Sequence, residues 1–63
     1  MFLMNREEAL EAMKDGHKIM HEYFSPEEHF YMVNGNIIDE SGYDWNFLFF
    51  KRDMYEKGWA IKE

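Results

Sequence analysis

The segment that decides the fold is HFYMVNGNIIDE, residues 29–40, in which two apolar runs flank an Asn-Gly pair. Asn-Gly is the strongest short-range signal for a two-residue turn of type I′, because both central residues of that turn need positive φ. Such a turn fixes the register of the flanking strands, placing Val33 opposite Asn36 and Phe30 opposite Asp39. We therefore predict a β-hairpin within this segment.

Both faces of the predicted hairpin carry large apolar side chains near the turn. The two sets are Phe30, Met32 and Ile37 on one face, and Tyr31, Val33 and Ile38 on the other. A hairpin at the rim of a single domain normally keeps one face in water. We therefore expect the second face to be covered, either by the rest of the fold or by a second copy of the chain.

The residues before the hairpin predict one helix and one strand. Asn5 and Glu8 have the spacing of a capping box, and Asp15-Gly16 is typical of a left-handed helix stop. Apolar residues between these signals recur at helical spacing, so we predict a helix over residues 6–15. Residues 17–24 then alternate in polarity as a strand does.

The residues around and after the hairpin complete an α+β pattern. Residues 25–28 predict a tight corner, and the apolar run over residues 45–50 predicts a strand, with a helix as the alternative. One helical turn over residues 53–57 precedes a closing strand over residues 59–61. This order predicts a single domain, residues 1–63, in which one N-terminal helix packs on a small antiparallel sheet of four to five strands.

Length and composition together predict self-association. A chain of 63 residues without cysteine can bury only a thin core, and small domains often need disulfides, a metal or association to be stable. The chain nevertheless has six Phe, four Tyr, two Trp and six Met residues. Contiguous apolar surface usually marks an interface, so we expect a homo-oligomer.

The charge and the hydropathy restrict the class of partner. Seven basic and 13 acidic residues give a net charge of −6, which disfavours direct binding to nucleic acid but suits a basic protein surface. No run approaches the roughly 20 apolar residues that a membrane helix needs, and the opening MFLM is too short for a signal sequence. We expect a soluble, cytoplasmic protein that does not associate with membranes.

No pattern of residues indicates catalysis. His17 and His21 have zinc-site spacing for a helix, but they fall in a predicted strand, where roughly 13 Å would separate them at about 3.3 Å per residue. The chain has no glycine-rich phosphate loop and no nucleophile motif. We expect no enzymatic activity, no metal site and no cofactor.

Two sets of side chains are candidates for binding. Aromatic rings beside basic groups can hold a base and its phosphates, often between subunits. The candidates for such a ligand site are Lys18, His21, Tyr23, Phe24, Arg52 and Trp59. Large apolar side chains on the hairpin and the following run are candidates for a protein interface, namely Tyr31, Val33, Ile38, Trp45, Phe47 and Phe49.

Both ends of the chain resemble a family of small phage proteins. Residues 8–19, EALEAMKDGHKI, resemble the opening helix and strand of that family, which read EAL, two or three residues, then GxxV. The closing segment of the family is similar to a second set of residues here, namely Asp53, Met54, Lys57, Trp59, Ile61 and Glu63. The family includes proteins that counter Thoeris defence by sequestering its signalling nucleotide, and a relative described as a type II-A anti-CRISPR.

The resemblance implies a phage-encoded anti-defence protein that captures a nucleotide-like signal in clefts between copies. Where the family has Arg after its first strand, this chain has His21, which would bind phosphate only when protonated. Where the family has a Gly-Trp pair, this chain has Tyr23-Phe24.

Two other functions are compatible with the sequence. The chain could be an acidic inhibitor that blocks a host defence effector by mimicking nucleic acid, with Asp39, Glu40 and Asp44 among its charges. It could also be a small phage structural or regulatory subunit.

Overall fold

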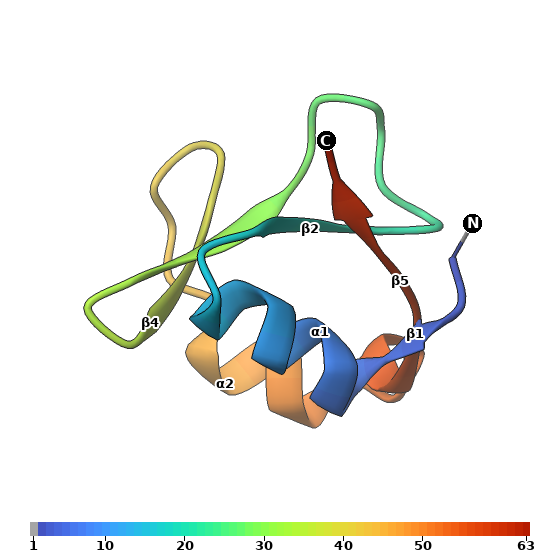
Figure 1. The fold of residues 1–63 in the computed structure, drawn as a ribbon. Helices are drawn as coiled ribbons and strands as arrows, with labels where there is room; N and C mark the ends of the chain where they lie inside the picture. Colours follow the sequence, from blue (N-terminus) through green and yellow to red (C-terminus); the bar gives the residue numbers. More distant parts are fainter. Residues whose placement is uncertain (1) are drawn as a thin grey trace.

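The computed structural model describes residues 2–63 and has the expected α+β architecture. The elements are β1 (Met4–Asn5), α1 (Arg6–Lys14), β2 (Lys18–His21), β3 (Phe30–Val33), β4 (Asn36–Asp39), α2 (Asn46–Lys51), the 3-10 helix η1 (Asp53–Glu56) and β5 (Lys57–Lys62). The five strands form one antiparallel sheet in the order β1-β5-β2-β3-β4, and α1 and α2 lie against the same face of it (Figure 1).

The hairpin of β3 and β4 is confirmed, including its register. Asn34 and Gly35 have φ of 51° and 82°, as a type I′ turn requires. Val33 pairs with Asn36, and Phe30 pairs with Asp39, as predicted. The turn chemistry therefore decides which hairpin residues face the helices.

Helix α1 begins at the predicted capping box and ends one residue earlier than predicted. The Asn5 side chain accepts a hydrogen bond from the Glu8 backbone N–H at 2.8 Å, and the Glu8 carboxylate accepts one from the Asn5 N–H at 2.9 Å. At the other end, Gly16 has φ of 96°, and its N–H donates to the carbonyl of Met13. Both ends of the helix are thus set by local sequence.

The prediction of a strand over residues 45–50 is wrong, because these residues form most of α2. Phe49 is completely buried, whereas its neighbour Phe50 is 52% exposed and Phe47 is 69% exposed. This distribution is that of a helix with one buried face. The position beside β4 that a further strand would take is already closed, since Trp45 N–H donates to the carbonyl of Ile37 at 2.8 Å.

The remaining predicted elements are present with changed bounds. The strand predicted over residues 17–24 covers only Lys18–His21. At the predicted corner, the N–H of Glu28 donates to the carbonyl of Ser25, and the Glu28 carboxylate accepts from the Ser25 N–H at 2.6 Å. The predicted helical turn is η1, although the Asp53 side chain does not cap it, and the closing strand is β5.

The core lies between the sheet and the two helices, with Trp59 at its centre. The ring of Trp59 lies 5.2 Å from Tyr55, 5.3 Å from Phe49 and 5.7 Å from Phe30, measured between ring centroids. Its indole N–H donates to the backbone carbonyl of Tyr55 at 2.7 Å, so the polar atom of this buried ring is satisfied. The aromatic residues therefore supply the core that a chain this short needs.

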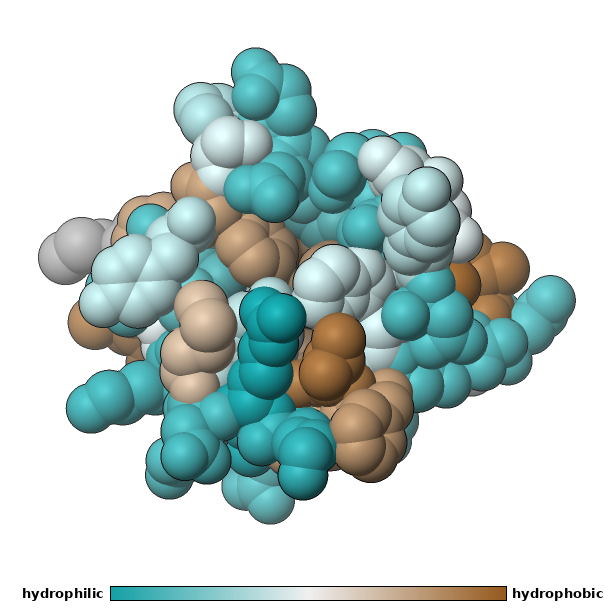
Figure 2. All heavy atoms as spheres, turned by 180° about the vertical axis from the view of Figure 1, so that it is seen from behind, coloured by the Kyte–Doolittle hydropathy of each residue, from teal (hydrophilic) through white to brown (hydrophobic). Residues whose placement is uncertain are grey.

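The opposite face of the sheet is not covered by a helix. Strand alternation places Tyr31, Val33 and Ile38 on this face, where Tyr31 and Ile38 are half-buried and Val33 is 43% exposed. Seen from behind, the molecule shows apolar side chains in separate groups among hydrophilic ones (Figure 2). In residues 2–63, no helix is both long and apolar enough to cross a membrane.

Candidate functional site

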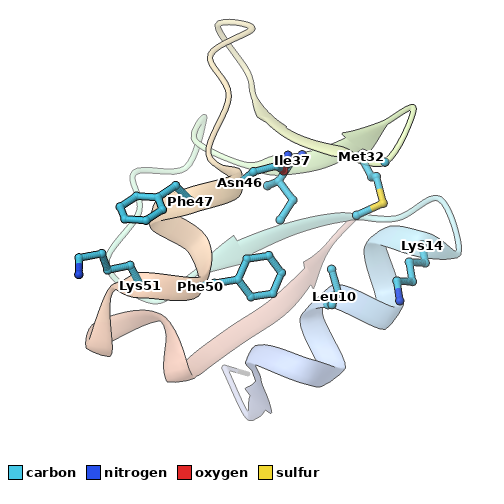
Figure 3. Close-up of a pocket in the computed structure, with 9 residues that line it drawn as sticks. Leu10, Lys14, Met32, Ile37, Asn46, Phe47, Phe50 and Lys51 are labelled. Carbon is cyan, nitrogen blue, oxygen red and sulfur yellow. Dashed lines mark hydrogen bonds between the residues drawn. The ribbon is translucent and has the colours of Figure 1, made fainter.

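An apolar groove of about 890 Å³ lies between α1, α2 and the hairpin of β3 and β4 (Figure 3). We call it the apolar groove. Its lining residues are Leu10, Lys14, Met32, Gly35, Ile37, Asn46, Phe47, Phe50 and Lys51. The volume is in the range of sites that hold a small molecule or part of a partner chain.

Each element supplies a defined part of the apolar groove (Figure 3). Helix α1 contributes Leu10, and α2 contributes Phe47 and Phe50. The hairpin contributes Met32 and Ile37, which face each other across the strand pair. Because Phe47 and Phe50 are 69% and 52% exposed, the groove presents two aromatic rings that the fold itself does not bury.

The charged groups of the groove lining are both positive. Lys14 lies one helical turn after Leu10, and Lys51 lies one turn after Phe47. The ammonium of Lys51 is 5.6 Å from the centroid of the Phe47 ring. Among residues 2–63, no carboxylate lines the groove, although the ammonium of Lys14 forms an exposed ion pair of 3.5 Å with the neighbouring Glu11. In a chain of net charge −6, the lining of the apolar groove therefore carries only positive charges, although Glu7 and Glu56 lie beside Leu10 and Phe50 in an adjoining pocket.

The outer edge of β4, which faces away from β3, has no free backbone hydrogen-bonding groups. The outward N–H of Ile37 donates to the side chain of Asn46 at 2.6 Å, and its carbonyl accepts from Trp45. The outward N–H of Asp39 donates to the carbonyl of Tyr43, and its carbonyl accepts from Gly42. Residues 42–46 thus close this edge of the sheet to a further strand.

Two of the predicted ligand residues are buried in the core and offer no surface to a ligand. His21 is 1% exposed, and its Nε2 lies 2.8 Å from the carbonyl oxygens of both Met54 and Lys57. Its Nδ1 accepts a hydrogen bond from the Tyr23 N–H at 3.3 Å. Trp59 is completely buried. Both residues were predicted to contact a ligand, but the central position of β2 and β5 in the sheet places them inside.

Three other predicted ligand residues do come together. Tyr23, Phe24 and Arg52 line a smaller cavity of about 220 Å³ together with Trp45 and Tyr55. We call it the aromatic pocket. The guanidinium carbon of Arg52 is 5.4 Å from the ring centroid of Trp45 and 5.6 Å from that of Tyr55. The aromatic pocket therefore already holds a cation against two of its rings.

Three carboxylates also line the aromatic pocket, from Glu28, Asp39 and Glu40. Together they exceed the single positive charge of Arg52, which makes the aromatic pocket unfavourable for phosphate groups. Lys18, the remaining predicted ligand residue, is exposed on β2 and does not line this pocket.

Asp39 has a structural role at the boundary of the aromatic pocket. The side chain is 8% exposed and accepts hydrogen bonds from the backbone N–H groups of Ser41 and Tyr43 and from the Trp45 indole. Burial alone would raise the pKa of this carboxyl, but the hydrogen bonds outweigh it, and the pKa lies below the ordinary value of 3.8. The charge of Asp39 therefore holds the loop after β4 in place.

The predicted interface residues are distributed over separate places. Phe47 lines the apolar groove, Trp45 lines the aromatic pocket, and Phe49 is completely buried in the core, so it cannot contact a partner. The hairpin residues Tyr31, Val33 and Ile38 lie on the opposite face of the sheet. They do not form one continuous surface with Phe47.

Apart from Phe47, none of the residues that line the apolar groove is a predicted site residue. If residues 45–50 are read as a helix, Phe47, Phe50 and Lys51 fall on one side of it, and this helical spacing is the signal that a strand assignment hides. The contribution of Leu10 could not be deduced from its own element, because the groove forms only where α1 meets α2 and the hairpin.

Comparison with known proteins adds no further residue. No family model, no curated protein and no solved structure matches this chain. The resemblance of its two ends to phage anti-defence proteins therefore stays a prediction. In the part of the chain from residue 2 to residue 63, no three His, Asp or Glu side chains gather as a metal site would require.

Proposed function

We propose that this protein is a non-enzymatic binding protein that captures an apolar segment of another protein in the apolar groove. The observation that carries the proposal is the exposure of Phe47 and Phe50 along a groove of about 890 Å³. Exposed apolar surface of this kind is unfavourable in water unless a partner covers it, and aromatic side chains often provide the main binding energy of interfaces.

Capture of a nucleotide-like signal has weaker support. Of its six candidate residues, His21 and Trp59 are buried, and Lys18 lies apart from the others. Tyr23, Phe24 and Arg52 share the aromatic pocket with three carboxylates, which repel phosphate. A ligand of this class would need positive charges that the described residues do not bring to the aromatic pocket.

Mimicry of nucleic acid has weaker support as well, because its candidate acids have local structural roles. Asp39 is buried, Glu40 accepts a hydrogen bond from the His29 N–H, and Asp44 accepts one from the Asn46 N–H. The broader form of that hypothesis, inhibition of a host protein by direct contact, is compatible with the apolar groove. That the captured protein belongs to a host defence system rests on the resemblance of the chain ends.

The proposal is tested by selecting binders from a random peptide library displayed on phage against the immobilised protein. Selected peptides should carry several apolar residues and bind the purified protein in solution. The variant Phe47→Asp should lose this binding, because it places a carboxylate in the lining of the apolar groove. Tyr43→Asp is the matched control, because Tyr43 is 71% exposed but does not line the groove.

Two results would overturn the proposal. One is failure to select any apolar peptide, and the other is selection of peptides that bind Phe47→Asp as tightly as the unchanged protein. Circular dichroism and the urea midpoint should show that both variants fold, which Phe47 permits because its side chain is mostly exposed.

A further inference from the structure

We infer that the segment captured in the apolar groove is an amphipathic α-helix of a different protein, with carboxylates at positions that reach Lys14 and Lys51. The inference rests on the proposed function and specifies the partner. It follows from three properties of the structure: the lack of free backbone hydrogen-bonding groups at the outer edge of β4, the spacing of the apolar walls of the groove and the sign of the charges that line it.

Because of the first property, the ligand must form its backbone hydrogen bonds within itself. An extended peptide needs backbone partners, which sheet edges usually provide. Here the outward N–H and carbonyl groups of Ile37 and Asp39 are already bonded to residues 42–46. The side-chain amide of Asn46 is also in use, accepting from Ile37 and donating to Asn36 at 2.9 Å. Apart from its two ends, a helix pairs its own backbone groups and so can enter an apolar groove without leaving them unpaired.

The second property matches the apolar stripe of a helix. Leu10 on α1 and Phe50 on α2 point toward one another, with Met32 and Ile37 of the hairpin beside them, and Phe47 lines the groove farther from Leu10 (Figure 3). Two helical walls and an apolar floor form the arrangement in which a third helix inserts side chains spaced at i, i+3 or i+4, and i+7. The occupant should therefore present large aliphatic side chains, which pack against the two exposed rings.

The third property sets the charge of the partner. Lys14 and Lys51 come from different helices and lie on opposite sides of the groove, with the Lys51 side chain extending away from Leu10 and Phe50 (Figure 3). No carboxylate among residues 2–63 lines the groove to balance them, and the Glu11 partner of Lys14 is itself largely exposed. Charge complementarity therefore favours a helix with acidic residues beside its apolar stripe and disfavours a basic one.

A second copy of this chain does not offer such a helix. The apolar residues Ala9, Ala12 and Met13 of α1 are buried in the core of their own chain. Helix α2 does expose apolar residues, but its sequence NFLFFK contains no acid and it forms a wall of the groove itself. The partner is therefore a different protein.

The test uses synthetic helical peptides that share one leucine stripe at i, i+3, i+4 and i+7. Three versions carry Glu, Gln or Lys beside the stripe, and a fourth repeats the Glu version with a central proline that prevents a helix. We expect the Glu peptide to bind about three- to tenfold more tightly than the Gln peptide, since two exposed ion pairs contribute modestly. The Lys peptide should bind more weakly than both, and the proline peptide should not bind.

Charge reversal in the protein provides the matched control. The double variant Lys14→Glu, Lys51→Glu should invert the preference, so that the Lys peptide binds more tightly than the Glu peptide. Lys18→Glu with Lys57→Glu makes the same change of charge on β2 and β5, at exposed positions away from the groove, and should leave the order unchanged. Raising the salt concentration should reduce the difference between the peptides.

Each contrary result identifies the step that is wrong. If the Glu, Gln and Lys peptides bind equally tightly and Phe47→Asp abolishes that binding, the acidic partner is wrong and the proposed function stands. If library peptides bind but no helical peptide does, the occupant of the groove is not a helix. A native mass of two copies that falls to one in Phe47→Asp would show that a second copy occupies the groove. If no apolar peptide of any kind binds, the proposed function fails too.

Discussion

The indole N–H of Trp45 donates a hydrogen bond of 2.8 Å to the Asp39 carboxylate, which joins the start of α2 to the end of β4. Trp45→Phe keeps an aromatic ring but removes the donor, and Asp39→Asn removes the charge. We expect each change to lower the free energy of unfolding by about 1 to 3 kcal/mol, as for hydrogen bonds to a charged group. Urea unfolding of both single variants and the double variant measures this. The double variant should lose less stability than the sum of the losses in the two single variants. If the two losses simply add, the two side chains are not coupled.

Acid should destabilise the protein partly through Asp39. Its pKa is below the ordinary value of 3.8 in the folded state, so its stabilising effect is complete above the pKa of the unfolded chain and is lost as the pH falls through the lower folded value. We expect the free energy of unfolding to decrease as the pH falls from about 5 to 3. The decrease should be smaller in Asp39→Asn, which has no such proton to bind. Parallel pH profiles for the two proteins would exclude this role.

His21 should act as a structural residue. Its Nε2 lies 2.8 Å from the carbonyl oxygens of Met54 and Lys57, and it therefore holds η1 and the start of β5 against β2. We expect His21→Phe to lower the free energy of unfolding by about 1 to 3 kcal/mol, because the ring still fills the space but the carbonyls lose their donor. His17→Phe is the control, because His17 is exposed and should tolerate the change. Similar urea midpoints for the two variants would contradict the prediction.

Gly58 should be harder to replace than Gly16, although their backbones are nearly alike. The φ angles are 94° and 96°, so alanine at either position is strained by about 1 to 2 kcal/mol. At Gly58, the new Cβ would also lie 3.0 Å from Nε2 of His21 and would contact the Glu22 carboxylate, whereas nothing lies within 4 Å of it at Gly16. We expect Gly58→Ala to unfold at lower temperature than Gly16→Ala. The reverse order would show that His21 and Glu22 move aside freely.

The elements that depend on local chemistry were predictable from the sequence. The Asn34-Gly35 turn sets the hairpin register, and the reciprocal bonds of Asn5 and Glu8 start α1, so each needs only neighbouring residues. Residues 45–50 were predicted wrongly because a nearly continuous apolar run has no clear period. Their helical state depends on contacts with β4, such as the bond from the Ile37 N–H to the Asn46 side chain, which no local pattern reveals.

The candidate site was predictable only in part, because burial and juxtaposition depend on the whole fold. Phe47, a predicted interface residue, is exposed and lines the apolar groove, whereas His21 and Trp59 lie opposite each other on the neighbouring inner strands β2 and β5, which removes both from the surface. Four aromatic residues are buried in the core, namely Phe30, Phe49, Tyr55 and Trp59. Of the exposed ones, Phe47 and Phe50 lie on α2, a helix that the sequence did not clearly indicate.

The position of β5 has a consequence for folding during synthesis. This strand pairs with both β1 and β2, at Met4 opposite Trp59 and at Ile19 opposite Ile61, so the centre of the sheet cannot form before residues 57–62 have left the ribosome. Contacts between residues so far apart in the sequence form late, and they lower the folding rate. Until then, α1 and β2 lack the strand that packs against them, so we expect the nascent chain to expose apolar segments of the kind that chaperones bind.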